Sequence, residues 1–221
     1  MAGSIAAHTF RPRDLVGGHV VLDLVNTVTA RDAQRVDWLD GYPRLLEWAA
    51  LTGEFDTADL GALRQLAEAA PDEAASALER ARELREALHA LVTALIRQDA
   101  ADAPDAAGAP ERFEGHWKRA ATAARFTLHG NTPQLRAGVE ASGLDFLAHE
   151  LALRAWDLLR SLPLERTRVC PGQRCGWVFV DSSRGGRRRW CDMATCGNSA
   201  KGRTHYRRTR TGDTDPQPPT R

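Results

Sequence analysis

The sequence predicts a mainly α-helical chain of the α+β class. A helical N-terminal domain with one short β-hairpin is followed by a small C-terminal module of the zinc-ribbon or treble-clef type. Three observations support this prediction. Apolar residues recur at helical spacing in several segments before residue 165, and two short alternating segments flank a turn near residue 131. All four cysteines lie in a basic segment after residue 165.

The length and the charge divide the chain into unequal parts. Its 221 residues, 43% of them hydrophobic, are enough for one sizeable core with a small appended module. The formal net charge is +1, but residues 1–165 carry −8 and residues 166–210 carry +10. This asymmetry predicts an acidic globular domain over 1–165 and a basic module over 166–210 that meets a polyanion. The polar, proline-rich residues 211–221 are expected to form a disordered tail.

No segment indicates membrane insertion or export. The chain has no apolar run as long as the roughly 18 residues that a transmembrane helix needs. Its first residues, MAGSIAAHTFRPRD, lack the apolar core and the small-residue cleavage site of a signal peptide. We therefore expect a cytoplasmic protein with no membrane contact.

The helical segments come first in the predicted order. Pro43 is expected in the first turn of a helix that ends before Gly53. A second short helix is expected over 57–69. A long one is expected over 71–99, where leucines recur at helical spacing. Residues 100–110 are rich in Ala, Asp, Gly and Pro, which predicts a loop.

A hairpin and a last helix complete the N-terminal domain. RFTLHG (125–130) and QLRAGVE (134–140) predict two strands around a tight turn. The helix that follows has a leucine stripe and should end at Pro163. Ser142 and Asp145 have the spacing of a capping box at its start.

The four cysteines have the pattern of a metal site. They form two C-x4-C pairs, and four thiolates are the ligand set of a closed tetrahedral zinc site. WVFVD (177–181) predicts a strand and RGG (184–186) a turn, which would return the second pair to the first. Because no coordination position is left open, we expect one structural Zn²⁺ ion. Its ligands are Cys170, Cys175, Cys191 and Cys196.

Two other uses of four cysteines stay open. Two disulfides would use all four, although a cytoplasmic chain keeps its thiols reduced. An iron–sulfur cluster would also use them, although nothing else in the sequence suggests electron transfer. The few apolar residues of the module favour zinc. Structural zinc contributes about 10–16 kcal/mol in finger peptides, and so small a core needs such a contribution to become ordered.

Basic side chains surround the cysteine pairs. RRR at 187–189 precedes the third cysteine. The segment after the fourth, GNSAKGRTHYRRTR, predicts a helix with basic residues in two neighbouring rows, which suits a phosphate backbone. Trp177, Trp190 and Tyr206 are of the type that stacks on bases or sugars. For Trp177 and Trp190 we favour the alternative, a place in the core of the module, which leaves Tyr206 available for stacking. The expected nucleic-acid contacts are Arg184, Arg187, Arg188, Arg189, Asn198, Lys201, Arg203, Arg207 and Arg208.

Two stretches resemble a known family. The run CGWVFVDSSRGGRRRWCDMATCGNSAKGRTHYRR resembles the CGNR zinc finger, the C-terminal module of a bacterial family of stress-induced transcription regulators. GHVVLDLVNTV (18–28) and DWLDGYPRLLEWAALTG (37–53) resemble the N-terminal ABATE domain of that family. The resemblance covers nearly the whole chain, and its most specific part is the cysteine segment. It implies that the four cysteines bind zinc and that the protein regulates transcription by binding DNA.

The family's basic positions carry over with two departures. Ser199 stands where the family has the arginine that ends its CGNR motif, and Gly185 stands where asparagine is usual. Neither change touches the cysteines, but any contact made by the missing arginine has to come from elsewhere. The basic positions that match are Arg184, Arg188, Arg189, Lys201 and Arg203.

Three polar side chains interrupt an apolar run near the N-terminus. In VVLDLVNTV, a helix would place Asp23 on one face with Asn26 and Thr27. Buried polar groups have to be hydrogen-bonded, so a structural role is the first interpretation. The alternative is a pocket for a small-molecule effector whose binding alters the basic module.

The sequence contains no catalytic motif that we can identify, and we expect that the protein is not an enzyme. HELAL (149–153) has Leu153 where an HExxH motif needs its second histidine. GxSxG, P-loop and GxGxxG motifs are absent from the chain.

These features together predict a DNA-binding transcription regulator whose N-terminal domain senses an effector or assembles the protein. The alternative is a module for RNA or for an acidic protein partner, because phosphate contacts carry no sequence information. A homodimer stays open. A pseudo-palindromic DNA target would imply a dimer, but no heptad repeat indicates one.

Overall fold

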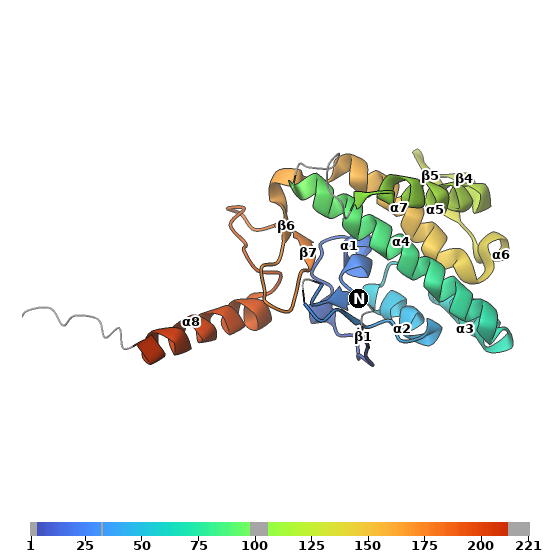
Figure 1. Cartoon of the computed structure of the whole chain (residues 1–221). Helices are drawn as coiled ribbons and strands as arrows, with labels where there is room; N and C mark the ends of the chain where they lie inside the picture. Colours follow the sequence, from blue (N-terminus) through green and yellow to red (C-terminus); the bar gives the residue numbers. More distant parts are fainter. Residues whose placement is uncertain (1–3, 32, 98–105, 212–221) are drawn as a thin grey trace, which may run out of the picture.

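The computed structural model of the protein describes residues 4–31, 33–97 and 106–211 (Figure 1). Side chains are described over these ranges except at 129, 204, 205 and 207–211. Helices dominate the chain and its strands are short, so the predicted mainly α fold is confirmed. None of the helices in the described ranges is long and apolar enough to cross a membrane.

Helices α2, α3 and α4 begin and end where the local sequence favours it. Pro43 lies in the first turn of α2 (Tyr42–Thr52), which ends at Gly53 in the left-handed conformation, with φ of 68°. Asp56 accepts a hydrogen bond from the backbone N–H of Ala58 and caps α3 (Thr57–Ala69). Two acidic residues follow Pro71 in the first turn of α4 (Pro71–Arg97) and favour the helix dipole there. These three helices agree with the sequence prediction to within one turn.

Helix α4 is the central element of the core. α5 (Ala109–Ala123) and α7 (Phe146–Ser161) pack against α4 and against each other. The short helix α1 (Val20–Val25) contacts both α4 and α7. Leu22, Leu84 and Leu151 are fully buried where these helices meet. Short helical segments connect the elements: α6 (Val139–Ser142) and 3-10 turns at Pro12–Asp14, Gly143–Asp145 and Leu164–Arg166.

Two parts of the fold were not predicted. α5 begins at Ala109, inside the segment expected to be a loop over 100–110, of which residues 100–105 lie outside the described ranges. A three-stranded sheet forms from segments that the sequence analysis left unassigned, in the order β1-β3-β2. β3 pairs in parallel with β1 and antiparallel with β2. The strands are β1 (Ser4–Ile5), β2 (Val28–Thr29) and β3 (Val36–Asp37).

The predicted hairpin is present, but the predicted capping box is not. β4 (Ala124–His129) and β5 (Thr132–Ala137) pair antiparallel over their whole length. α7 begins at Phe146, and neither polar side chain before it caps the helix. Ser142 instead lies within hydrogen-bond distance of His149, with 3.0 Å between Oγ and Nδ1. Asp145 forms an ion pair with Arg80 at 2.6 Å, so tertiary partners replace the local cap.

The C-terminal segment forms a small sheet, a cluster of four cysteines and a last helix. β6 (Thr167–Val169) pairs antiparallel with β7 (Val178–Val180). A π-helical turn, Met193–Gly197, leads into α8 (Asn198–Thr211), as the sequence predicted a helix there. Figure 1 shows α8 extending away from the body of the molecule. Residues 212–221, nearly all of the predicted disordered tail, lie outside the described ranges.

Candidate zinc centre and basic surface

The four cysteines converge on one point. Their Sγ atoms all lie within 4.8 Å of one another. The Sγ of Cys191 is 3.5 Å from that of Cys175 and 3.7 Å from that of Cys196. A tetrahedron with Zn–S bonds of about 2.3 Å has edges of about 3.8 Å, so the spacing fits one zinc ion. The predicted ligand set is therefore brought together as the site requires.

The surroundings of the cluster also fit a closed, structural site. Cys170, Cys175 and Cys191 are buried, and Cys196 is half-buried. Hydrogen bonds with Cys175 and Cys191 lower the pKa of the Cys170 thiol, whereas the pKa values of the other three thiols are raised by their neighbours and by burial, so one thiolate is held by neighbouring thiols. Thiolates are the form that binds zinc. A structural zinc ion at this place would hold the two C-x4-C pairs together.

The loop of the first cysteine pair leaves no room for a side chain at Gly172. A Cβ atom added there would lie 2.9 Å from Cβ of Cys175 and 3.0 Å from Sγ of Cys196. The backbone N–H of Cys175 donates to the Gly172 carbonyl at 3.0 Å, and that of Cys170 donates to the Trp177 carbonyl at 2.7 Å. Glycine therefore allows the tight turn that brings two thiolates from one loop to one ion.

Asn26 joins the cysteine-bearing segment to the N-terminal part of the chain. Its side-chain Nδ2 donates to the Val178 carbonyl and its Oδ1 accepts from the Val178 N–H, both at 2.8 Å. The amide thus pairs with β7 as a neighbouring strand would. Asn26 is 2% exposed and Val178 is fully buried, and Val178 belongs to the main hydrophobic core. Nearby, the N–H of Val180 donates to the Gly17 carbonyl at 2.9 Å.

The turn after β2 holds the first cysteine loop. The backbone N–H of Ala30 donates to the Cys175 carbonyl at 2.9 Å, and Oγ1 of Thr29 donates to the Arg174 carbonyl at 2.9 Å. Ala30 adopts a positive φ of 55°, an uncommon conformation for a residue other than glycine. The ring of Trp38 meets that of Trp177 edge-on, with centroids 5.3 Å apart. The cysteine loop is therefore fixed on the N-terminal part of the chain by backbone and aromatic contacts.

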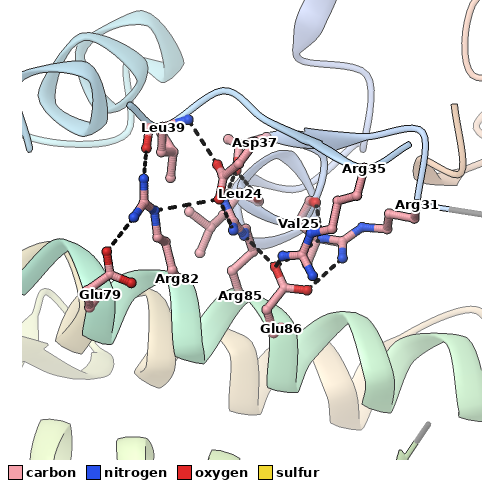
Figure 2. A network of polar contacts seen from close by, with 11 residues as sticks. Leu24, Val25, Arg31, Arg35, Asp37, Leu39, Glu79, Arg82, Arg85 and Glu86 are labelled. Atoms are coloured by element: carbon pink, nitrogen blue, oxygen red, sulfur yellow. Dashed lines mark hydrogen bonds and ion pairs between the residues drawn. The ribbon is translucent and has the colours of Figure 1, made fainter. Parts of the chain in front are cut away.

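A buried ion-pair network fixes Thr27 and Asp37 on α4 (Figure 2). Arg85, whose side chain is 1% exposed, binds both carboxylate oxygens of Asp37 at 2.8 and 2.6 Å. The same guanidinium donates to Oγ1 of Thr27 at 3.1 Å. Burial alone would raise the pKa of Asp37, but the hydrogen bonds from Arg85 lower it below its usual value. The bidentate pair therefore satisfies a buried charge on each side.

A second group of ion pairs in Figure 2 centres on Glu86. Arg31 contacts its carboxylate at 2.7 Å and Arg35 contacts it at 2.6 Å. Burial opposes ionisation, but the neighbouring arginines lower the pKa of Glu86 to about 2. Arg31 also donates to the Val25 carbonyl at 3.0 Å. Because Arg31 follows Ala30, this network fixes the turn that holds the cysteine loop.

The three polar residues proposed as a pocket do not converge on a shared space. Asp23 accepts from the Gly17 N–H at 2.8 Å, whereas Asn26 pairs with β7. Thr27 donates to the Leu24 carbonyl at 2.7 Å and accepts from Arg85. Burial raises the pKa of Asp23 to about 6, although the hydrogen bond from Gly17 opposes that change. Each side chain therefore has its own partner within the fold.

Arg188 differs from the other predicted nucleic-acid contacts because its guanidinium is used inside the module. Its Nε donates to the Trp190 carbonyl at 3.0 Å and its Nη2 donates to the Cys191 carbonyl. Its guanidinium lies 4.5 Å from the centroid of the Phe179 ring. Its backbone N–H donates to the buried carboxylate of Asp181 at 2.7 Å. These contacts place Arg188 across the base of the loop that carries Cys191.

The other predicted contacts lie on the surface. Arg189 is exposed and lies 5.3 Å from the Trp190 ring centroid. The side chains of Arg207 and Arg208 lie outside the described part of the structure, although their backbone belongs to α8. Trp177 is buried and Trp190 half-buried, whereas Tyr206 is 64% exposed. The remaining predicted contacts are all exposed: Arg184, Arg187, Asn198, Lys201 and Arg203.

Sequence reasoning missed the residues that attach the module to the core. The burial of Arg85 could have been predicted, because this residue lies beside Leu84 and Leu88 on the core-facing side of α4. A charged residue at such a position needs a buried partner. The role of Thr29 and Ala30 could not have been predicted, because it depends on a loop 145 residues away in the sequence.

Two protein-family models match the chain. The ABATE model, whose description is "Putative stress-induced transcription regulator", matches residues 18–162. The CGNR zinc finger model matches residues 166–209, which contain all four cysteines. No curated protein matches the sequence.

Proposed function

The chain belongs to the ABATE family and carries a CGNR zinc finger, and from this premise we propose that it regulates transcription in the cytoplasm by binding DNA through its basic module. The proposal involves no catalytic step. The N-terminal domain positions the module and responds to an effector.

The observation that carries the proposal is the exposed basic surface at the start of α8 and on the loop before it. Lys201 and Arg203 are exposed near the beginning of a helix that extends from the body (Figure 1). Residues 166–210 contain 12 Lys and Arg side chains but only Asp181 and Asp192 as acids. Such a helix can approach duplex DNA without a clash from the other described residues, and its charge favours the phosphate backbone.

Zinc would determine where this helix points. Asp192 accepts hydrogen bonds from the N–H groups of Ala194 and Thr195 at 3.2 and 2.9 Å and caps the turn that carries Cys196. That turn continues into α8 without a break. A zinc ion bound by Cys191 and Cys196 would therefore fix both ends of the turn. We expect removal of zinc to release α8 and to abolish DNA binding.

The first test is binding of the zinc-loaded protein to random-sequence duplex DNA, measured by fluorescence anisotropy at several salt concentrations. We expect Lys201→Gln/Arg203→Gln to weaken binding to all sequences and to lower the salt slope by about 2, roughly 1 for each phosphate contact removed. Lys118→Gln/Arg119→Gln is the matched control, because it also removes one lysine and one arginine, and both residues are exposed on α5. We leave Arg188 out because its loss would disturb the fold of the loop.

The outcomes separate DNA binding from its alternatives. No binding at low salt with zinc present, or equal loss in the module variant and the control, would contradict the proposal. Competition at fixed salt by duplex DNA, RNA and heparin tests the kind of polyanion. Preference for one duplex sequence supports regulation, whereas a stronger preference for RNA favours an RNA-binding module.

A cavity in the N-terminal domain supports the effector part of the proposal. It has a volume of about 520 Å³ and lies between α2, α3 and α4. Tyr42, Leu46 and Leu78 give it an apolar lining, and Arg82 lies at its border. Arg82 also donates to the Leu39 carbonyl and approaches Asp37 at 3.5 Å (Figure 2). An occupant could thus act on the network that fixes the cysteine loop.

We expect a side chain that fills this cavity to alter the zinc site. Ala75→Phe, which extends a cavity-lining residue, should change the rate at which a chelator removes zinc. Ala50→Phe is the matched control, because Ala50 is exposed on α2 and does not line the cavity. Equal rates of zinc release in the wild type and both variants would contradict a coupling between the cavity and the zinc site.

A further inference from the structure

The β4–β5 hairpin exposes large apolar side chains on one of its faces. Phe126 is 70% exposed, Leu128 is 68% exposed and Leu135 is 40% exposed. Phe126 lies directly opposite Leu135, and Leu128 lies opposite Pro133. Because side chains alternate between the two faces of a strand, these four residues share one face of the hairpin.

The apolar surface continues from the hairpin onto α7. Trp156 is 47% exposed and lines one groove together with Pro133 and Leu135. We call the whole surface the apolar patch. It consists of Phe126, Leu128, Pro133, Leu135 and Trp156.

No residue in the described part of the chain covers this patch. Alternation of apolar and polar residues is typical of a sheet that is covered on one face, yet no described residue buries these side chains. The longer segments outside the described ranges, QDAADAPD (98–105) and GDTDPQPPTR (212–221), contain no large apolar residue. A two-stranded hairpin is also marginally stable by itself. Another molecule is therefore the candidate cover.

We propose that the apolar patch docks against the same patch of a second copy of this chain, so that the N-terminal domains form a two-fold symmetric homodimer. The hairpin part of the patch is apolar and therefore complementary to itself. The groove that continues it onto α7 adds charges of both signs, from Glu54, Arg136, Arg154 and Asp157. Charged and polar residues, such as Arg125 and Thr127, occupy the alternating positions and belong to the opposite face. A second copy is thus the simplest partner of matching chemistry.

The area of the patch is adequate for such a dimer. Large aromatic side chains present about 150–250 Å² each, so the exposed parts of the patch amount to on the order of 500 Å², near the upper end for a monomer surface. Two copies would bury about 1,000 Å² of apolar surface between them. This reaches the roughly 1,000 Å² that a biological interface has to clear and lies below the roughly 1,200–2,000 Å² of a standard one, so we expect a dimer of about micromolar affinity.

The position of the patch leaves the basic module free. Figure 1 shows the hairpin and α8 at opposite ends of the molecule. Dimerisation through the hairpin would place two α8 helices at the outer ends of the assembly. The dimer deepens the proposed function by giving the regulator two DNA-binding ends, but its formation does not depend on DNA binding, and the test below contains no DNA.

The test is the mass of the full-length, zinc-loaded protein under reducing conditions, measured by sedimentation equilibrium. The range runs from about 1 to about 100 µM, where a Kd of micromolar order becomes visible. We expect a concentration-dependent dimer. Phe126→Asp/Leu128→Asp should raise the dimer Kd at least 100-fold, roughly, because it replaces two central anchors with charges. Both residues are largely exposed, so circular dichroism should show an unchanged helix content.

Leu66→Asp is the matched control, because Leu66 is a 41% exposed leucine on α3, outside the patch. It should dimerise like the wild type. If the hairpin variant folds poorly, Trp156→Glu tests the same patch from α7 and should also produce monomers. A monomeric wild type over the whole range would overturn the proposal. Dimers that persist in both patch variants, or a control that dissociates equally, would overturn it as well.

Discussion

Replacing Asn26 should uncouple the zinc module from the core of the N-terminal domain. The side chain forms two 2.8 Å hydrogen bonds with the backbone of Val178, and both residues are buried. In Asn26→Ala, the N–H and the carbonyl of Val178 lose their partners while they stay out of contact with water. Trp177 directly precedes β7, and its carbonyl accepts a hydrogen bond from the backbone N–H of the predicted ligand Cys170. We therefore expect lower stability together with faster zinc release.

The size of the effect follows from the two orphaned groups. A buried backbone group left without a partner costs about 1–3 kcal/mol, so Asn26→Ala should lower the free energy of unfolding by about 2–6 kcal/mol. The whole stability of a typical domain is about 5–15 kcal/mol, so such a loss is a large part of it. Values at the upper end would leave a domain of ordinary stability close to unfolding.

Asn26→Asp gives the sharper form of this prediction because its effect depends on pH. In its neutral form the new carboxyl group can still donate to the Val178 carbonyl and accept from the Val178 N–H, whereas a carboxylate cannot donate and faces that carbonyl. Burial and this repulsion should raise the folded-state pKa of the new carboxyl above its unfolded value of about 3.9. A raised pKa means that stability is complete below the unfolded value and is lost as pH rises through the folded value. The variant should therefore approach the wild type in acid and weaken towards neutral pH.

The measurement is urea unfolding followed by circular dichroism for each variant and the wild type, at about pH 5 and about pH 8. Asn131→Asp is the matched control, because Asn131 is exposed in the turn of the hairpin. Its difference from the wild type should stay within about 0.5 kcal/mol at both pH values. A loss below about 1 kcal/mol for Asn26→Ala, or no pH dependence for Asn26→Asp, would refute the reasoning.

Three further predictions address the loop, the buried acid and the ion-pair network. Gly172→Ala should weaken zinc affinity about 10-fold or more in a chelator competition, because the added Cβ would lie 2.9 Å from Cβ of the ligand Cys175. Gly202→Ala has open space around it and should leave the zinc affinity unchanged. Asp23→Asn should stabilise the protein by about 3 kcal/mol at pH 8 and by about half as much at pH 5 in the same unfolding assay, because burial raises the Asp23 pKa to about 6 and the cost of ionisation begins above the unfolded value of about 3.9. Arg85→Met should cost about 3 kcal/mol, the lower end for a broken buried pair, because it removes the bidentate partner of Asp37 and leaves the 3.5 Å contact with Arg82 as its remaining ion pair in the described part of the chain. Arg85→Met/Asp37→Asn should recover part of that loss in a double-mutant cycle.

The sequence predicted those features whose cause is local. The cysteine spacing located the metal ligands because each C-x4-C pair is one short loop and the strand and turn between them are short as well. The long helix α4 was predicted closely because its leucine stripe repeats over several turns. α5 was missed although Phe113, Trp117 and Ala120 have helical spacing, because the Pro- and Gly-rich stretch before it read as a continuing loop.

Features set by distant partners could not be read from the sequence. β1, β2 and β3 have two residues each, too few to show the alternation that marks a strand. Asn26 was placed on a helix face with two other polar residues, but its partner is 152 residues away in the zinc finger. A local pattern identified it as a buried polar group that needs a hydrogen bond, and only the tertiary structure could show with which strand.

The position of β7 has a consequence for how the two family modules act together. β7 carries Val178 into the main core and is also one strand of the small sheet next to the cysteines. Zinc binding to structural sites contributes folding free energy, about 10–16 kcal/mol in finger peptides. Part of that free energy should therefore stabilise the N-terminal domain through β7 and Asn26. Linkage is reciprocal. A binding event that stabilises the contacts of Thr27 and Asp37 should therefore strengthen zinc binding by the coupling free energy between the two sites. Through this linkage, binding of an effector near α4 could change zinc binding and with it the ordering of α8.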